Sequence, residues 1–213
     1  MKKLQWMIGC LVLVLLSVGV SSAFADAPVP GRAGRAEVRF LEGMMDHHQM
    51  ALDMANDCLD KATDDAVRTL CQNILTAQSA EIQQMHGWLL TWYNVDYSPM
   101  PMSSMTSMMG MVPTAEATED MTMSMGNMPA TDPTMMMGMM AGLSRAQGKD
   151  YDIAFLESMI DHHDDAVHMS QRILARDPEG TGHSELRTFA QKIIDDQSAE
   201  IQMMETMLTR LGD

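Results

Sequence analysis

Two pairs of adjacent histidines are the residues best suited to chemistry in this sequence, and both pairs have the same methionine neighbours. His47 and His48 follow Met44, which lies three residues before the first histidine, and precede Met54, six residues after the second. The corresponding residues of the second copy are Met159, His162, His163 and Met169. Thioether sulfur is a soft donor that selects Cu(I), and imidazole nitrogen also suits copper. The spacing therefore predicts a copper-binding pattern that the chain uses twice.

The segments around these pairs have the periodicity of helices. In residues 40–55 (FLEGMMDHHQMALDMA), rotation of about 100° per residue puts Met44, His48 and Ala51 on one stripe, with His47 at its margin. Residues 155–170 (FLESMIDHHDDAVHMS) repeat this face. A single inward histidine is more often a core residue bonded to a neighbour, and methionine commonly fills gaps. Because the copies differ at many exposed positions yet keep these residues, the repetition favours a metal site.

A second motif is also repeated, on the helix expected after each histidine pair. Gln-Ser-Ala-Glu-Ile occurs at residues 78–82 and again at residues 197–201. Buried polar groups are costly without partners, so we expect these side chains to accept a ring N–H from a histidine and thereby aim its other nitrogen. For Glu81 a solvated position at the helix edge is an equal alternative. The polar residues are Gln78, Glu81, Gln197 and Glu200, and each motif is followed by a methionine, Met85 or Met204.

The chain divides into five expected segments: a signal peptide (1–25), a loose N-terminal arm (26–34), a first helical hairpin (35–97), a methionine-rich linker (98–150) and a second hairpin (151–213). The first hairpin is expected to contain helices over about 35–60 and 66–93, separated by a polar turn. Chains of ~60 residues are marginally stable alone. We therefore expect an all-α protein in which the two hairpins pair through their repeated faces.

The N-terminus has the features of a secretory signal: an initial Met-Lys-Lys, an apolar stretch over residues 8–20, and Ala-Phe-Ala before Asp26. The apolar stretch is too short for a comfortable membrane span. We expect the mature protein to reside in the periplasm or to be secreted, away from the membrane. The net charge is −15, and cleavage would remove two lysines and no acid. This charge argues against a nucleic-acid partner and favours cations.

Two cysteines remain after the expected cleavage, Cys58 and Cys71, on either side of the first turn. An exported protein reaches an oxidising compartment, which permits a disulfide between them. The second copy has Ile173 and Ala190 at the matching positions. We therefore favour a disulfide that links the two helices of the first hairpin. The alternative is that the two cysteines are free thiols that bind metal.

The segment between the hairpins has a different composition. Residues 100–140 contain 15 of the 27 methionines, mixed with Pro, Gly, Ser and Thr, and show no helical or strand period. This composition predicts a disordered linker. Methionine is unusual in solvated linkers, so the enrichment favours additional soft-metal binding over a sticky contact surface.

The two motif pairs resemble the family known as domain of unknown function 305. The resemblance implies a ferritin-like four-helix bundle, and some members are similar to periplasmic copper-binding proteins of copper tolerance. The second copy departs from the first because Asp165 replaces Met50 and His168 replaces Asp53. The motifs that carry the resemblance are His47, His48, Ala51, Met54 with Gln78, Glu81, Ile82, Met85, and His162, His163, Ala166, Met169 with Gln197, Glu200, Ile201, Met204.

The leading functional hypothesis is an exported protein that sequesters Cu(I), or Ag(I) by the same chemistry, or passes it to another periplasmic copper protein. We expect a binding protein and not an enzyme. The alternative is an oxidase-like metalloenzyme on the same bundle, but di-iron sites of that kind use Glu-x-x-His motifs, and neither hairpin contains one. A structural module that binds no metal tightly is the third possibility.

Overall fold

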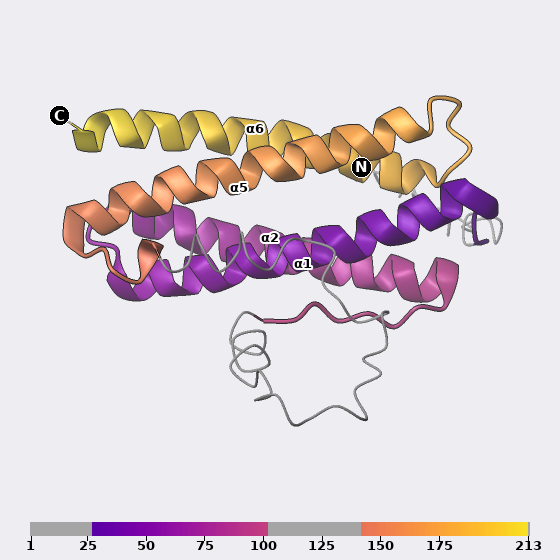
Figure 1. Ribbon diagram of the computed structural model, residues 1–213, viewed down its shortest axis with the longest axis horizontal. Helices are drawn as coiled ribbons and strands as arrows, with labels where there is room; N and C mark the ends of the chain where they lie inside the picture. Colours follow the sequence, from indigo (N-terminus) through magenta and orange to yellow (C-terminus); the bar gives the residue numbers. More distant parts are fainter. Residues whose placement is uncertain (1–26, 102–141, 213) are drawn as a thin grey trace, which may run out of the picture.

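The computed structural model describes residues 27–101 and 142–212, and all of its long elements are helices. Helix α1 (Gly31–Lys61) and α2 (Asp65–Tyr93) form the first hairpin, and α5 (Gly148–Arg176) and α6 (Ser184–Gly212) form the second. The architecture is the expected all-α four-helix bundle (Figure 1). None of the described helices is long and apolar enough to cross a membrane. The expected signal peptide and residues 102–141 of the expected linker lie outside the described residues.

Local sequence signals set the ends of α2. The Asp64 side chain accepts hydrogen bonds from the backbone N–H groups of Ala66 and Val67, which the first helical turn would otherwise leave unpaired. At the other end Asn94 takes the left-handed conformation (φ 53°) and its N–H bonds to the Leu90 carbonyl. The Asp64 cap lies in the turn where the chain reverses between α1 and α2 over only a few residues, and the Asn94 cap ends α2.

The N-terminal arm is the part of the expected organisation that the structure corrects. Helix α1 begins at Gly31, inside the segment expected to be loose, and Gly34 is buried. A side chain would not fit at Gly34, because the Val29 carbonyl occupies that space. His183, which precedes α6, also holds the arm: its ring places Nδ1 2.6 Å from Glu37 Oε2 and Nε2 3.1 Å from the Ala27 carbonyl oxygen. The local composition gave no sign of this tertiary anchoring.

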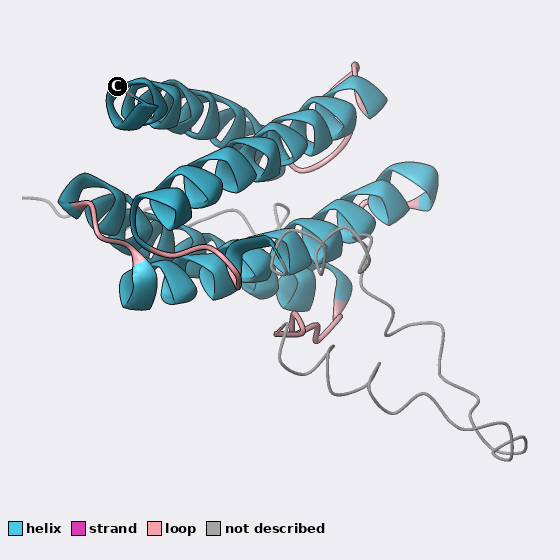
Figure 2. Ribbon diagram, turned by 60° about the vertical axis from the view of Figure 1, so that its left-hand side comes forward, coloured by secondary structure: helices cyan, strands magenta, loops and turns pink. Residues whose placement is uncertain are grey.

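The hairpins pack against each other through α1 and α5, which run in opposite directions and cross near their centres (Figures 1 and 2). One apolar cluster lies on each side of the crossing. The first combines the C-terminal half of α1 with the N-terminal half of α5, and the second combines the N-terminal half of α1 with the C-terminal half of α5. Each cluster therefore contains side chains from both hairpins.

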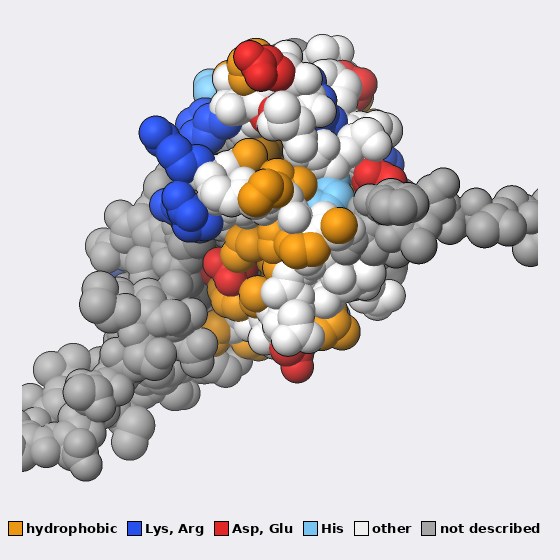
Figure 3. Space-filling model, turned by 90° about the vertical axis from the view of Figure 1, so that its right-hand side faces the viewer, with side chains coloured by type: hydrophobic (Ala, Val, Ile, Leu, Met, Phe, Trp, Pro, Cys, Tyr) orange, Lys and Arg blue, Asp and Glu red, His pale blue; other side chains and the backbone are white. Residues whose placement is uncertain are grey.

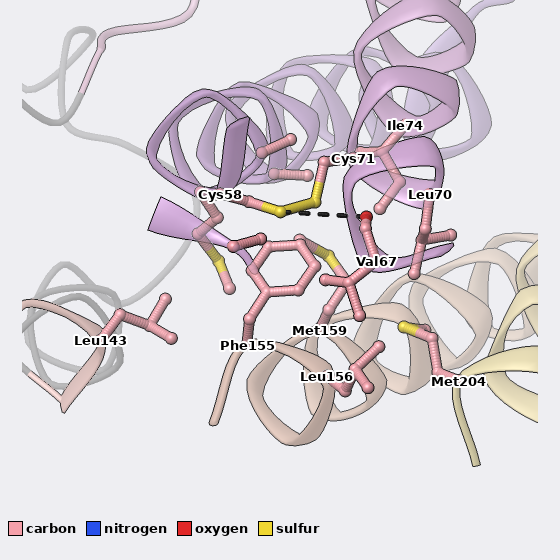
Figure 4. Close-up of a cluster of buried hydrophobic side chains, with 14 of the residues drawn as sticks. Cys58, Val67, Leu70, Cys71, Ile74, Leu143, Phe155, Leu156, Met159 and Met204 are labelled. Atoms are coloured by element: carbon pink, nitrogen blue, oxygen red, sulfur yellow. Dashed lines mark hydrogen bonds between the residues drawn. A yellow bond between two sulfur atoms is a disulfide. The ribbon is translucent and has the colours of Figure 1, made fainter. Parts of the chain in front are cut away.

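Cys58 and Cys71 form a disulfide inside the first cluster, with their Cα atoms 6.3 Å apart. Figure 4 shows Phe155 and Met159 of α5 pointing toward this bridge from the other hairpin. All four side chains are fully buried. The disulfide thus links α1 to α2 and also forms part of the surface on which the second hairpin packs.

Polar contacts reinforce the pairing of the hairpins at the end where α1 turns into α2. The Asp152 carboxylate of α5 accepts hydrogen bonds from the backbone N–H groups of Thr63 and Asp64, at 3.0 Å each. Arg210 of α6 bonds both carboxylate oxygens of Asp64, each at 2.8 Å. Hydrogen bonds from Arg210 are the largest cause of the low pKa of Asp64, which is about 2. The two hairpins therefore share a hydrogen-bonded turn as well as a core.

Candidate metal centre

The two histidine pairs meet where α1 crosses α5. The ring centroids of His47 and His162 are 3.7 Å apart, and His162 Nε2 donates to the His47 carbonyl oxygen at 2.9 Å. His48 lies 6.4 Å from His47, and His163 lies 6.0 Å from His162, measured between ring centroids. All four rings are buried. The crossing thus brings together four imidazoles that occupy two distant stretches of sequence.

The outer histidine of each pair is held by a glutamate from the following helix. His48 Nε2 lies 2.8 Å from Glu81 Oε2, and His163 Nε2 lies 2.7 Å from Glu200 Oε2. A carboxylate accepts, so each Nε2 donates its proton, and in the neutral ring Nδ1 then carries the lone pair. This is the hydrogen bond expected from the sequence for both glutamates. It orients the ring as the partners of metal-binding histidines commonly do.

The crossing also holds several buried polar atoms that have no hydrogen-bond partner among the described residues. An unsatisfied buried group costs about 1–3 kcal/mol, so native structures contain few of them. Here they are concentrated around the histidines and the repeated glutamines. Neutral imidazole nitrogens with free lone pairs fit a soft metal ion, which would satisfy them. The atoms are both ring nitrogens of His47, Nδ1 of His48, His162 and His163, both amide atoms of Gln78, and Oε1 of Gln197.

The glutamines differ from the expectation. Neither Gln78 nor Gln197 bonds to a histidine ring, although both are buried as predicted. The carboxylates of Glu81 and Glu200 occupy the ring N–H groups of the outer histidines instead, and His162 uses its own N–H on a backbone carbonyl. The predicted role of the two glutamines as histidine partners is therefore wrong for this arrangement.

Thioethers border the histidines on both sides, and the crossing distributes them in a way the sequence did not indicate. We expected each hairpin to supply its own set. Instead, Met54 of the first hairpin joins Met159 and Met204 of the second in one cluster, while Met44 and Met85 lie in the other. Met169 is only partly buried and packs against that second cluster. Each group of methionines therefore combines both hairpins, because equivalent halves of α1 and α5 lie at opposite ends.

The described residues contain no group of three or more His, Cys, Asp or Glu side chains arranged to hold a metal ion. Met44, Met54, Met85, Met159 and Met204 are each completely buried. Buried imidazole nitrogens and thioether sulfurs are therefore among the donors that this interior offers. This donor set matches soft monovalent ions better than ions that require carboxylate oxygens.

The protein environment favours uncharged inner histidines. Burial lowers the pKa of His47 well below its usual range, and the neighbouring His162 lowers it further. Burial also lowers the pKa of His162, as does His163, although the hydrogen bond to the His47 carbonyl acts in the opposite direction. An imidazole must be neutral to donate a lone pair to a metal. These two rings are therefore kept in the form that can act as a ligand.

Lys192 is a member of the site that sequence analysis missed. Its ammonium nitrogen on α6 lies 2.9 Å from Glu81 Oε1 on α2, so the ion pair joins the two hairpins. Burial alone would raise the pKa of Glu81, but the hydrogen bonds from His48 and Lys192 outweigh burial and leave it lowered. The equivalent Glu200 has no such lysine among the described residues. Only the repeated motifs were informative in the sequence, and Lys192 lies outside them.

Comparisons with known proteins identify a family for this chain. A domain-of-unknown-function model, DUF305, matches residues 37–208, which include all four helices in large part. No curated protein matches the chain.

Three similar solved structures cover most of both chains. A DUF305 protein from Streptomyces coelicolor is 27% identical, with coverage of 83% of this chain and 92% of that one and a TM-score of 0.60. CopM in its Cu(I)-bound form is 26% identical, with 82% and 96% coverage and a TM-score of 0.58. CopM in an Ag-bound form, obtained by co-crystallisation, is 28% identical with the same coverage and a TM-score of 0.56. Since the family model spans well over half of the sequence, this chain belongs to the DUF305 family.

Proposed function

We propose that this protein binds Cu(I), and Ag(I) by the same chemistry, in an exported compartment where it sequesters copper or transfers it during copper homeostasis and tolerance. The observation that carries the proposal is the set of buried imidazole nitrogens without hydrogen-bond partners at the crossing of α1 and α5. Buried thioethers lie in the clusters on either side. The similar CopM structures, described as Cu(I)-bound and Ag-bound, support this assignment.

In this proposal the glutamates orient the histidines, and the histidines and methionines donate to the metal. Glu81 and Glu200 hold the outer histidines with Nε2 protonated, which leaves Nδ1 available as a donor. The methionine sulfurs supply soft donors that carry no proton and therefore keep their capacity in acid. The protein contributes binding and orientation, and we propose no catalytic step. The ligands come from Met44, His47, His48, Met54, Met85, Met159, His162, His163, Met169 and Met204.

The decisive experiment is an anaerobic competition titration of Cu(I) against a chromophoric chelator. The variant with His47, His48, His162 and His163 replaced by Ala should lose the tightest sites. A matched control replaces the exposed histidines His86 and His168 and should retain them. If the first variant keeps full high-affinity binding, the site has been assigned to the wrong residues.

A second set of variants separates the loss of metal donors from the loss of folding. Replacing Met44, Met85, Met159 and Met204 with Leu removes sulfur at nearly constant volume, so the helices should stay folded by circular dichroism. Cu(I) affinity should nevertheless fall. Deleting residues 100–140 should lower the total copper bound and leave the tightest sites in place. Metal analysis after growth with copper, beside zinc and iron, would show another metal if the proposal fails.

A further inference from the structure

Positive charge gathers at one end of this acidic protein. The sequence has 29 Asp and Glu against 14 Lys and Arg. Figure 3 faces this end and shows Lys and Arg side chains beside a band of hydrophobic ones. Five exposed arginines occupy the N-terminal part of α1 and the C-terminal part of α5: Arg32, Arg35, Arg39, Arg172 and Arg176.

None of these guanidinium groups forms an ion pair with a described carboxylate, although Arg39 interacts electrostatically with Glu42. Among the described residues, Arg35, Arg172 and Arg176 form no ion pair, and Arg39 donates to the Arg35 carbonyl oxygen at 3.2 Å. By contrast, Arg187 and Arg210 are paired with aspartates. In a chain with a twofold excess of acids, a cluster of arginines without ion pairs to the described residues offers a site for an external anion.

The arginines border a groove with an apolar floor. The groove has a volume of about 110 Å³ and lies between α1 and α5, beyond the second apolar cluster. Phe40, Met169 and Ile173 form the floor. Arg39, Arg172 and Arg176 form the rim. Its chemistry therefore combines a small apolar depression with three guanidinium forks, which bind carboxylates in a bidentate manner.

We propose that this groove docks an acidic segment of a partner protein, with an apolar side chain on the floor and flanking carboxylates on the rim arginines. Arginine clusters recognise acidic motifs in this way. A membrane is a poorer occupant, because the depression is concave and the remaining acidic charge of the chain repels an anionic bilayer. Met169 is the only one of the ten candidate metal ligands that is not buried. A partner docked in this groove would lie beside Met169 and could exchange metal there. This last step rests on the proposed function.

The test uses the full mature chain without metal and a fluorescein-labelled peptide, Glu-Asp-Met-Glu-Met-Asp-Glu, followed by fluorescence anisotropy. Replacing Arg172 and Arg176 with Glu should weaken binding about tenfold, a change of ~1.4 kcal/mol, because solvent screens exposed ion pairs and keeps the contribution of each one small. The matched control, Arg145→Glu with Lys149→Glu, makes the same charge change at exposed positions elsewhere and should bind normally.

Several outcomes would overturn the proposal. Equal weakening by the control pair would show that only net charge matters. If a peptide with Ser in place of Met binds equally well, the apolar floor does not contribute to binding, and the proposed mode of docking is wrong. Binding of phosphatidylglycerol vesicles that depends on Arg172 and Arg176, without binding of the peptide, would assign the surface to a membrane. Because the peptide assay contains no copper, its failure leaves the Cu(I) titration intact, and the two proposals fail separately.

Discussion

The two hairpins carry the same motifs but protect them differently. In the first hairpin the Glu81 side chain is 11% exposed and is paired with Lys192. In the second the Glu200 side chain is 26% exposed and bonds to His163, with no lysine partner in the part of the chain that the structure describes. Met54 is completely buried, while its counterpart Met169 borders an open groove. Equivalent sequence positions thus yield one enclosed and one more open half. The difference indicates that duplication of a motif fixes the donor residues, whereas the residues around each copy decide how accessible those donors are to solvent.

The largest expected effect comes from separating the halves. Deleting residues 151–213 exposes the buried face of α1, because both apolar clusters draw side chains from both hairpins. The remaining hairpin should lose its cooperative thermal transition, as expected for a short chain without a complete core. Differential scanning calorimetry measures this directly. A sharp transition in the truncated protein would mean that the first hairpin folds independently.

The two histidine–glutamate pairs should respond unequally to the same substitution. Glu81→Gln disrupts the ion pair with Lys192 as well as the bond to His48, so we expect Cu(I) affinity to fall roughly 10–100-fold, the usual range for the partners of metal-bound histidines. Glu200→Gln disrupts only the bond to His163 and should have the smaller effect. Chelator competition compares the variants. Identical losses would contradict the inequality of the two halves.

The disulfide distinguishes the first hairpin from the second in stability. Replacing Cys58 and Cys71 with Ser should lower the free energy of unfolding by ~2–3 kcal/mol, because the bridge closes a loop across the first turn. Urea denaturation of the oxidised and substituted proteins measures the loss. Alkylation of the protein, purified without reductant and then denatured, should find no free thiol, and two free thiols would refute the bridge.

The smallest expected effect concerns the ion pair between Asp64 and Arg210, which joins the two hairpins. Because Arg210 lowers the pKa of Asp64 to about 2, the pair stabilises the protein above the ordinary aspartate pKa of 3.8 and loses this contribution as the pH falls toward 2. Both groups are partly solvated, so Arg210→Ala should cost only a small amount of stability near neutral pH. Urea unfolding at pH 2 and pH 6 tests this, and an equal cost at both pH values would contradict it.

Features that lie within one hairpin and are carried by its motifs could be predicted from the sequence, whereas features that depend on the two hairpins meeting could not. The repeated spacing gave the four helices, and the repeated glutamates gave the hydrogen bonds of Glu81 and Glu200. The pairing of Met54 with the second hairpin depends on α5 crossing α1 in the opposite direction, which no local pattern specifies. The anchoring of the arm by His183 and the ion pair of Lys192 likewise arise from single residues outside any motif.

The antiparallel crossing of α1 and α5 has the geometry of a two-fold symmetric homodimer whose subunits have been joined in one chain. In such an isologous interface, equivalent residues meet at the axis, as the rings of His47 and His162 do here. Two identical subunits would have to accept every substitution twice. A fused chain can change one copy alone, which allows the disulfide and Lys192 to serve one half while the arginine groove opens beside the other.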